Sequence, residues 1–214
     1  MASREDDPDR THGEVLWALA VGGRLSVAEL VVRTAFFADE VSRALDALER
    51  SGGVQRGQTP DRVERFRLTS QGQGVAEASL AADRREVGVA LEELLPEFDA
   101  ANVALKDLLH RWQMRMVGTT LAVNDHSDAG YDGRILGELG RLFTQAKPWL
   151  DRLSALRPRY ALYRERLSRA VDRAGRGERD FLSGLSVDSV HSVWWQLHSD
   201  LLGVLGRERG DRDV

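Results

Sequence analysis

Three short helical patterns, followed by a segment with a period of two residues, constrain how the first third of this chain can fold. A helix is predicted from Thr11, with its apolar residues on one face and its end at Gly22 and Gly23. Ser26 and Glu29 then have the spacing of a capping box, in which each side chain satisfies a free backbone amide of the other residue. We therefore expect a second helix to begin at this point.

The third helix is predicted by apolar spacing. Val41, Leu45 and Leu48 recur at the positions that share one face of a helix, and Gly52 and Gly53 follow as a stop. The residue at the start of this helix is Phe37, where a small polar side chain is usual. An aromatic residue at this position is unusual for a turn that faces a DNA groove and natural for a contact with a partner protein.

A β-hairpin is predicted after the third helix. Phe66 and Leu68 alternate with Arg65 and Arg67, which gives one apolar and one charged face, and Pro60 begins the turn. Three helices followed by a hairpin is the element order of a winged helix-turn-helix. The segments LSVAELVVRTAFFADEVSRALDALERSGGVQRG and RFRLTSQG also resemble the MarR/PadR-type winged helices of bacterial regulators, over about a third of the chain.

Composition limits the class of protein. Of the 214 residues, 42% are apolar, which is enough for a hydrophobic core. The absence of cysteine excludes disulfides and thiolate metal sites and favours a cytoplasmic location. The N-terminus resembles no signal peptide, and no apolar run is long enough to span a membrane. A net charge of −4 means that any binding to DNA must depend on a local basic patch.

The remainder of the chain has helical patterns. Helices are expected at 75–95, ending near Pro96, at 97–115, 131–147, 149–156 and 159–174, and at about 187–206. The predicted fold is mainly α (α+β), with an N-terminal winged helix-turn-helix and a C-terminal all-α bundle. The predicted organisation is a flexible tail at 1–11, the winged helix at 12–74, the helical domain at 75–206 and a second flexible tail at 207–214.

Charge gives opposing indications about DNA. The third helix, which enters the major groove in DNA-reading proteins, has a net charge of −2, whereas the hairpin has a net charge of +2. Docking on a protein and a purely structural role therefore stay open as alternatives. The candidate DNA-contacting residues are Arg43, Arg50, Arg56, Arg62, Arg65 and Arg67.

A second candidate site is the polar stretch NDHSDAGYD at 124–132. The last predicted helix has a polar stripe beside its apolar face, and buried polar groups need partners. We therefore expect Asp125 or His126 to lie near His191 or His198, and Asp128 or Ser127 to cap the helix that follows. The stretch anchors the loop, lines a pocket for a polar or anionic small molecule with Trp112 or Trp195 as the floor, or, as a third alternative, holds a metal ion. The candidate ligand-binding residues are Trp112, Asn124, Asp125, His126, Asp188, His191, Trp195 and His198.

Most of residues 96–206 also resemble a helical module found at the C-terminal end of actinobacterial pyruvate-phosphate-dikinase-like (PEP-utilising) proteins. The resemblance rests on FDAANVALKDLLHRWQ, NDHSDAGYD, RYALYRERLSRAV and VDSVHSVWWQLHSDLLGVLGR, whereas Val190 and Trp195 depart from the family pattern. A phosphotransferase of that family needs a nucleotide-binding domain and a phosphohistidine domain, which do not fit in this length. No phosphate-binding loop, nucleophile elbow or zinc-binding spacing is present.

The sequence therefore predicts a non-enzymatic transcriptional regulator without a cofactor or metal. Its expected partners are DNA, a small-molecule effector and a second copy of the chain, with no membrane contact. Leu80, Val87, Leu91 and Leu94 are the positions predicted to pair in that dimer. The alternatives are an accessory or regulatory module for a phosphotransferase-like enzyme, docked through the winged helix, and a protein that sequesters a small molecule.

Overall fold

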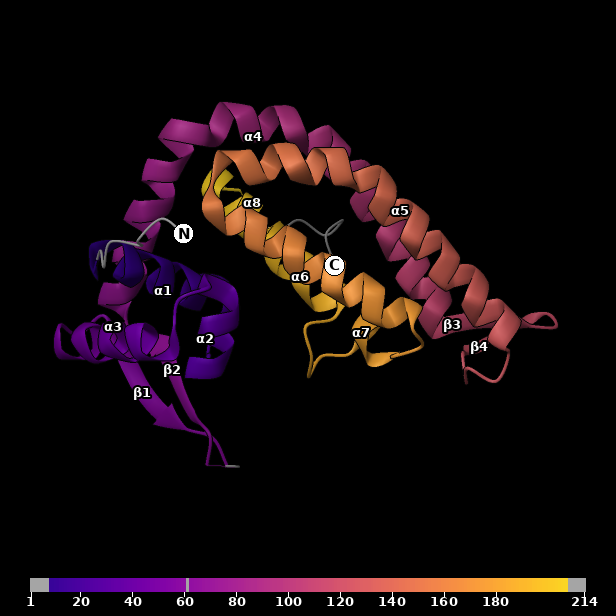
Figure 1. Ribbon diagram of the computed structural model, residues 1–214, viewed down its shortest axis with the longest axis horizontal. Coiled ribbons are helices and arrows are strands. Elements are labelled where there is room, and N and C mark those ends of the chain that lie inside the picture. Colours follow the sequence, from indigo (N-terminus) through magenta and orange to yellow (C-terminus); the bar gives the residue numbers. More distant parts are fainter. Residues whose placement is uncertain (1–7, 61, 208–214) are drawn as a thin grey trace. The chain divides into compact units, whose positions relative to one another are not determined.

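Helices dominate the fold, and the only strands in the described part of the chain form two small antiparallel hairpins (Figure 1). A computed structural model describes residues 8–60 and 62–207. The predicted mainly α (α+β) class is confirmed. The chain divides into two compact units. One runs to Gly88 and includes the residues from Ser199 onward, and the other is Val89–His198.

The first unit contains the three helices and the hairpin in the predicted order. They are α1 (Pro8–Gly22), α2 (Val27–Thr34), α3 (Ala38–Arg50), β1 (Val54–Gln58) and β2 (Glu64–Leu68). The capping box forms, because the backbone amide of Ser26 donates to Glu29 Oε2 at 2.8 Å and the amide of Glu29 donates to Ser26 Oγ at 3.3 Å. Phe66 is buried and exchanges two backbone hydrogen bonds with Leu25, so the hairpin packs against the helices.

The described residues from Ser199 onward also belong to the first unit. Trp17 Nε1 in α1 donates to Asp200 Oδ1 at 2.7 Å, and Asp200 is fully buried. Arg84 Nε in α4 (Ser70–Gln113) donates to the carbonyl oxygen of Val204 at 2.7 Å. Asp200 and Val204 both lie in α8 (Val190–Leu205). Two hydrogen bonds across more than a hundred residues thus hold the end of α8 in this unit.

The second unit is built on the later part of α4 and on the helices that follow. These elements are β3 (Met114–Val117), β4 (Thr120–Val123), α5 (Ala129–Leu156), α6 (Pro158–Gly175), α7 (Asp180–Ser183) and the first part of α8. Aromatic rings form its centre, where Phe98 stacks on Trp194 with ring centroids 5.2 Å apart. Trp149 Nε1 and Trp194 Nε1 donate to Leu94 O and Asn102 Oδ1, so the buried indole nitrogens are satisfied.

Two helices continue through prolines that were predicted to end or interrupt them. Pro96 lies inside α4 and Pro148 lies inside α5. A proline within a helix removes one backbone hydrogen bond and costs about 3 kcal/mol. The aromatic core beside both positions, with Trp149 next to Pro148, offsets this cost through burial. The predicted helix ends at these prolines are therefore wrong.

The predicted boundaries also differ from the structure. The first helix starts at Pro8 and not at Thr11, while the tail residues 1–7 and 208–214 lie outside the described residues. The domain boundary predicted between residues 74 and 75 falls inside α4. The structure divides its two compact units later, after Gly88. The helix predicted to reach residue 115 ends at Gln113, where a second hairpin that was not predicted begins. The residues predicted to form the dimer seam are largely occupied within the chain, because Val87, Leu91 and Leu94 are buried.

Candidate functional site

The arginines predicted to contact DNA are largely paired with carboxylates. Arg56 on β1 lies 2.8 Å from Asp46, 3.0 Å from Glu49 and 3.1 Å from Glu64, and the first two of these acids belong to α3. The pKa of the Arg56 guanidinium is raised, first by its hydrogen bond to Glu49 and then by that to Glu64. The positive charge of the first strand therefore neutralises the acidic third helix.

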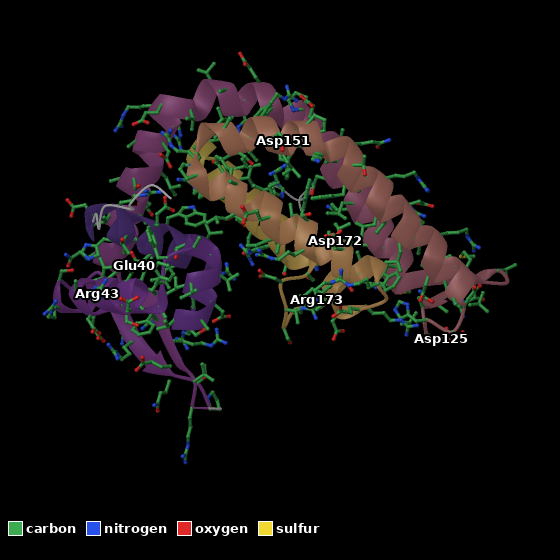
Figure 2. The ribbon with its side chains drawn as sticks, viewed as in Figure 1. Glu40, Arg43, Asp125, Asp151, Asp172 and Arg173 are labelled. Atoms are coloured by element: carbon green, nitrogen blue, oxygen red, sulfur yellow. The ribbon has the colours of Figure 1, made fainter. Side chains whose placement is uncertain are left out.

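Other cations of this surface follow the same pattern. Arg43 Nη1 lies 2.8 Å from Asp39, as part of the α3 surface on which Figure 2 labels Arg43 and Glu40. Arg65 Nη1 lies 2.7 Å from Glu29 Oε2. Burial alone would raise the pKa of the Glu29 carboxyl, but hydrogen bonds from Ser26 and Arg65 hold it below its ordinary value.

Three of the predicted arginines have no carboxylate partner among residues 8–60 and 62–207: Arg50, Arg62 and Arg67. Arg67 Nη2 donates instead to the amide oxygen of Gln55 at 2.7 Å. Arg62 is at the turn of the hairpin and has a positive φ of 63°, a conformation that non-glycine residues adopt rarely. These three cations are the ones that could still meet a phosphate.

Phe37 begins α3, as predicted, and its side chain is 69% exposed. Its backbone amide donates to Glu40 Oε2 at 2.6 Å, which satisfies one of the free amides at the start of the helix. An exposed aromatic side chain beside acidic groups is a typical anchor for a protein interface.

The polar stretch follows the second hairpin and closes on itself. His126 Nδ1 lies 2.9 Å from Asp132 Oδ2, and Asp132 is buried at the start of α5. The amide nitrogen of Asn124 donates to Asp132 Oδ1 and to the carbonyl oxygen of Trp112, both at 3.0 Å. The Trp112 and His126 rings are packed with centroids 4.4 Å apart. The site is thus a local pair of imidazole and carboxylate, framed by α4 and α5.

Hydrogen bonding fixes the protonation pattern of the imidazole. Both hydrogens of the Asn124 amide nitrogen are used by Asp132 and Trp112, so the 3.2 Å contact between this nitrogen and His126 Nδ1 is not a hydrogen bond. An ionised carboxylate only accepts hydrogen bonds, so the 2.9 Å hydrogen bond between His126 and Asp132 Oδ2 has its proton on His126 Nδ1. The other ring nitrogen, Nε2, is not among the buried atoms that lack a partner and makes no hydrogen bond within the described chain. This nitrogen therefore reaches solvent.

Two arginines border this pair. Arg179 Nη2, at the start of α7, donates to the carbonyl oxygen of His126 at 3.1 Å and lies 3.8 Å from Asp132 Oδ2. Arg115 Nη2 on β3 donates to Asp125 Oδ1 at 2.8 Å and to Ser127 Oγ at 3.2 Å. Figure 2 shows Asp125 beside the start of α5, next to the second hairpin. Hydrogen bonds from Ser127 and the charge of Arg115 lower the pKa of Asp125.

The helix start after the polar stretch is as predicted. Asp128 is the N-cap of α5, and its carboxylate accepts from the backbone amide of Tyr131 at 2.8 Å. Tyr131 Oη donates to the carbonyl oxygen of Arg111 at 2.8 Å, which ties the new helix to the end of α4. Residues 124–132 thus serve as an anchor and a helix start.

The predicted pairing of His126 with the last helix is replaced by the local pair with Asp132. Asp188 instead receives two hydrogen bonds of 2.8 Å from the buried Arg166. His198 packs on Phe98 with ring centroids 4.9 Å apart. The remaining predicted ligand-binding residues are His191, which is half-buried, and Trp195, which is largely exposed.

Of the eight predicted ligand-binding residues, Trp112, Asn124 and His126 form one cluster, with Asp125 at its edge. Asp132, Arg179 and Arg166 carry important contacts and were not among the candidates. Asp132 lies inside the polar stretch and could have been found there. Arg179 and Arg166 are separated from their partners by many residues of chain, so no local pattern indicates them.

A groove of about 270 Å³ lies elsewhere in the second unit, between α4 and α5. Its lining residues are Glu97, Ala100, Ala101, Ala104, Leu142, Gln145, Ala146 and Trp149. None of the predicted ligand-binding residues is in this lining. Among the described residues no group of three potential metal ligands occurs, and no helix there has the combination of length and hydrophobicity needed to cross a membrane.

Comparison with known proteins gives one partial likeness. The chain is 36% identical over 93 residues to the phenylalanine–tRNA ligase alpha subunit of Methanopyrus kandleri. The aligned part is 44% of this chain and only 17% of that protein. No family model matches the chain, and no solved structure matches it.

Proposed function

We propose that this chain is a non-enzymatic accessory or regulatory protein whose N-terminal unit docks on another protein. The observation that supports this proposal is the set of three carboxylates around Arg56, because it removes the central cation of the hairpin from any phosphate contact. The acidic α3 carries the exposed Phe37 at its start, which offers an aromatic anchor. A complementary partner surface has an apolar pocket with basic residues at its rim.

A phosphotransferase-like enzyme is the partner that the resemblance of residues 96–206 favours. If this chain regulates such an enzyme, we propose that it binds the effector at the cluster of His126 and Asp132, where His126 Nε2 reaches solvent. The likeness to a tRNA ligase subunit covers too small a share of that protein to transfer its activity.

The proposed docking role is tested first by measuring whether the natural chain binds DNA. A mobility-shift titration at about 50 mM salt, where phosphate contacts are strongest, compares the natural chain with an Asp46→Asn, Glu49→Gln, Glu64→Gln triple variant. We expect no shift for the natural chain and a salt-sensitive shift for the variant, in which Arg56 is released. Binding of duplex DNA by the natural chain under these conditions would contradict the proposal.

The partner contact has its own test. Calorimetric titration of the natural chain into a phosphotransferase-like enzyme from the same source should give saturable binding. Phe37→Ser should weaken this binding, whereas Val89→Ser, on an exposed valine of α4, should not. Equal binding by the two variants would exclude Phe37 as the anchor.

A transcriptional regulator is the second candidate function. Arg50, Arg62 and Arg67 favour it, because they have no carboxylate partner in the described ranges and Arg62 is at the turn of the hairpin. If this function holds, Arg62→Ala combined with Arg67→Ala weakens binding of all DNA sequences and reduces its salt dependence by about two phosphate contacts. An Arg43→Ala variant is the matched control, because Arg43 is paired with Asp39.

A further inference from the structure

We draw no further inference here: the strongest candidate, the groove of about 270 Å³ between α4 and α5 that Ala100, Ala104 and Trp149 line, presents mainly apolar side chains, and nothing in the structure shows what covers it.

Discussion

His126 and Asp132 form a local pair in which imidazole Nδ1 lies 2.9 Å from carboxylate Oδ2 across a separation of six residues. The pair joins the end of the second hairpin to the first turn of α5. It also leaves Nε2 as the ring nitrogen that meets solvent. One contact therefore stabilises the fold and determines which atom of His126 a ligand can reach.

We expect His126→Ala to lower the free energy of unfolding of the second unit by about 1–3 kcal/mol, because the buried Asp132 loses a donor. Asp132→Asn should have an effect of similar size, since an amide cannot replace the accepting carboxylate for both neighbours. Urea unfolding followed by tryptophan fluorescence measures both changes. Asp99→Ala, at an exposed position of α4, is the control and should leave stability nearly unchanged. Equal stability of His126→Ala and the natural chain would show that the pair is not an anchor.

A larger loss in the free energy of unfolding is expected from Arg166→Leu. Arg166 is buried and makes three hydrogen bonds of 2.8 Å, two to Asp188 and one to Gln196 Oε1. Its removal takes three charge-assisted hydrogen bonds from the contact of α6 with the segment that leads into α8, and we expect a cost of about 3 kcal/mol in the free energy of unfolding. The matched control is Arg164→Leu, which breaks the exposed pair with Asp151 and should cost less than about 1 kcal/mol. Thermal melting of the two variants should differ clearly, and similar midpoints would contradict this account.

The order of elements in the first unit could be predicted from the sequence because its signals are local. The capping box of Ser26, the glycine stops and the alternation around Phe66 each depend on residues that are close along the chain. The same reasoning placed Asp128 at the start of α5. Local propensity was outweighed at Pro96 and Pro148, where the cost of a proline is smaller than the gain from packing a long helix against the aromatic core.

The second hairpin was missed because Met114, Arg115 and Met116 are also good helix formers and appear to extend α4. The signal that could have indicated it is Gly118 followed by Thr119 and Thr120, a turn before β-branched residues. For the polar stretch, the sequence showed correctly that His126 needs a partner. It did not show which one, because Asp132 and the distant stripe on the last helix satisfy the same chemical requirement, and only packing chooses between them.

Stability of the first unit should fall in acid because of Glu29. The carboxyl has a lower pKa in the folded chain than its ordinary 4.5, so the unfolded chain binds the proton more readily. The contribution of Glu29 is therefore present above about pH 4.5 and is lost as pH falls through the folded pKa. Urea unfolding at pH 7 and at pH 3.5 measures the effect. Glu29→Gln should reduce the difference between the two pH values, whereas Glu77→Gln, on an exposed position of α4, should not.

The end of α8 should be needed for the first unit to be stable. Trp17→Phe removes the 2.7 Å hydrogen bond to Asp200 and leaves that fully buried carboxylate with one donor fewer. We expect this change to lower the free energy of unfolding of the first unit by about 1–3 kcal/mol. Asp200→Asn retains an acceptor for Trp17 and should cost less. Hydrogen exchange of the α1 amides provides the measurement, and unchanged protection in Trp17→Phe would mean that the contact contributes nothing to this unit.

A last prediction concerns His191 in α8, whose Nδ1 is buried without a hydrogen-bond partner among the described residues. Burial lowers the pKa of this imidazole below its ordinary 6.5. Between the folded pKa and 6.5 the unfolded chain binds more protons, so stability is fully present above about pH 6.5 and falls as pH is lowered.

The variant His191→Met replaces the unpaired ring with an apolar side chain of comparable length. At pH 7.5 it should be as stable as the natural chain or more stable by about 1 kcal/mol, because a buried polar atom without a partner is removed. Between pH 7.5 and pH 5.5 the natural chain should lose more stability than the variant. His110→Gln, at an exposed position of α4, should keep the full pH dependence of the natural chain. If His191→Met instead lowers stability at pH 7.5 and retains the natural pH dependence, Nδ1 has a partner in solution and the ring contributes to the packing of α8 as a satisfied polar group.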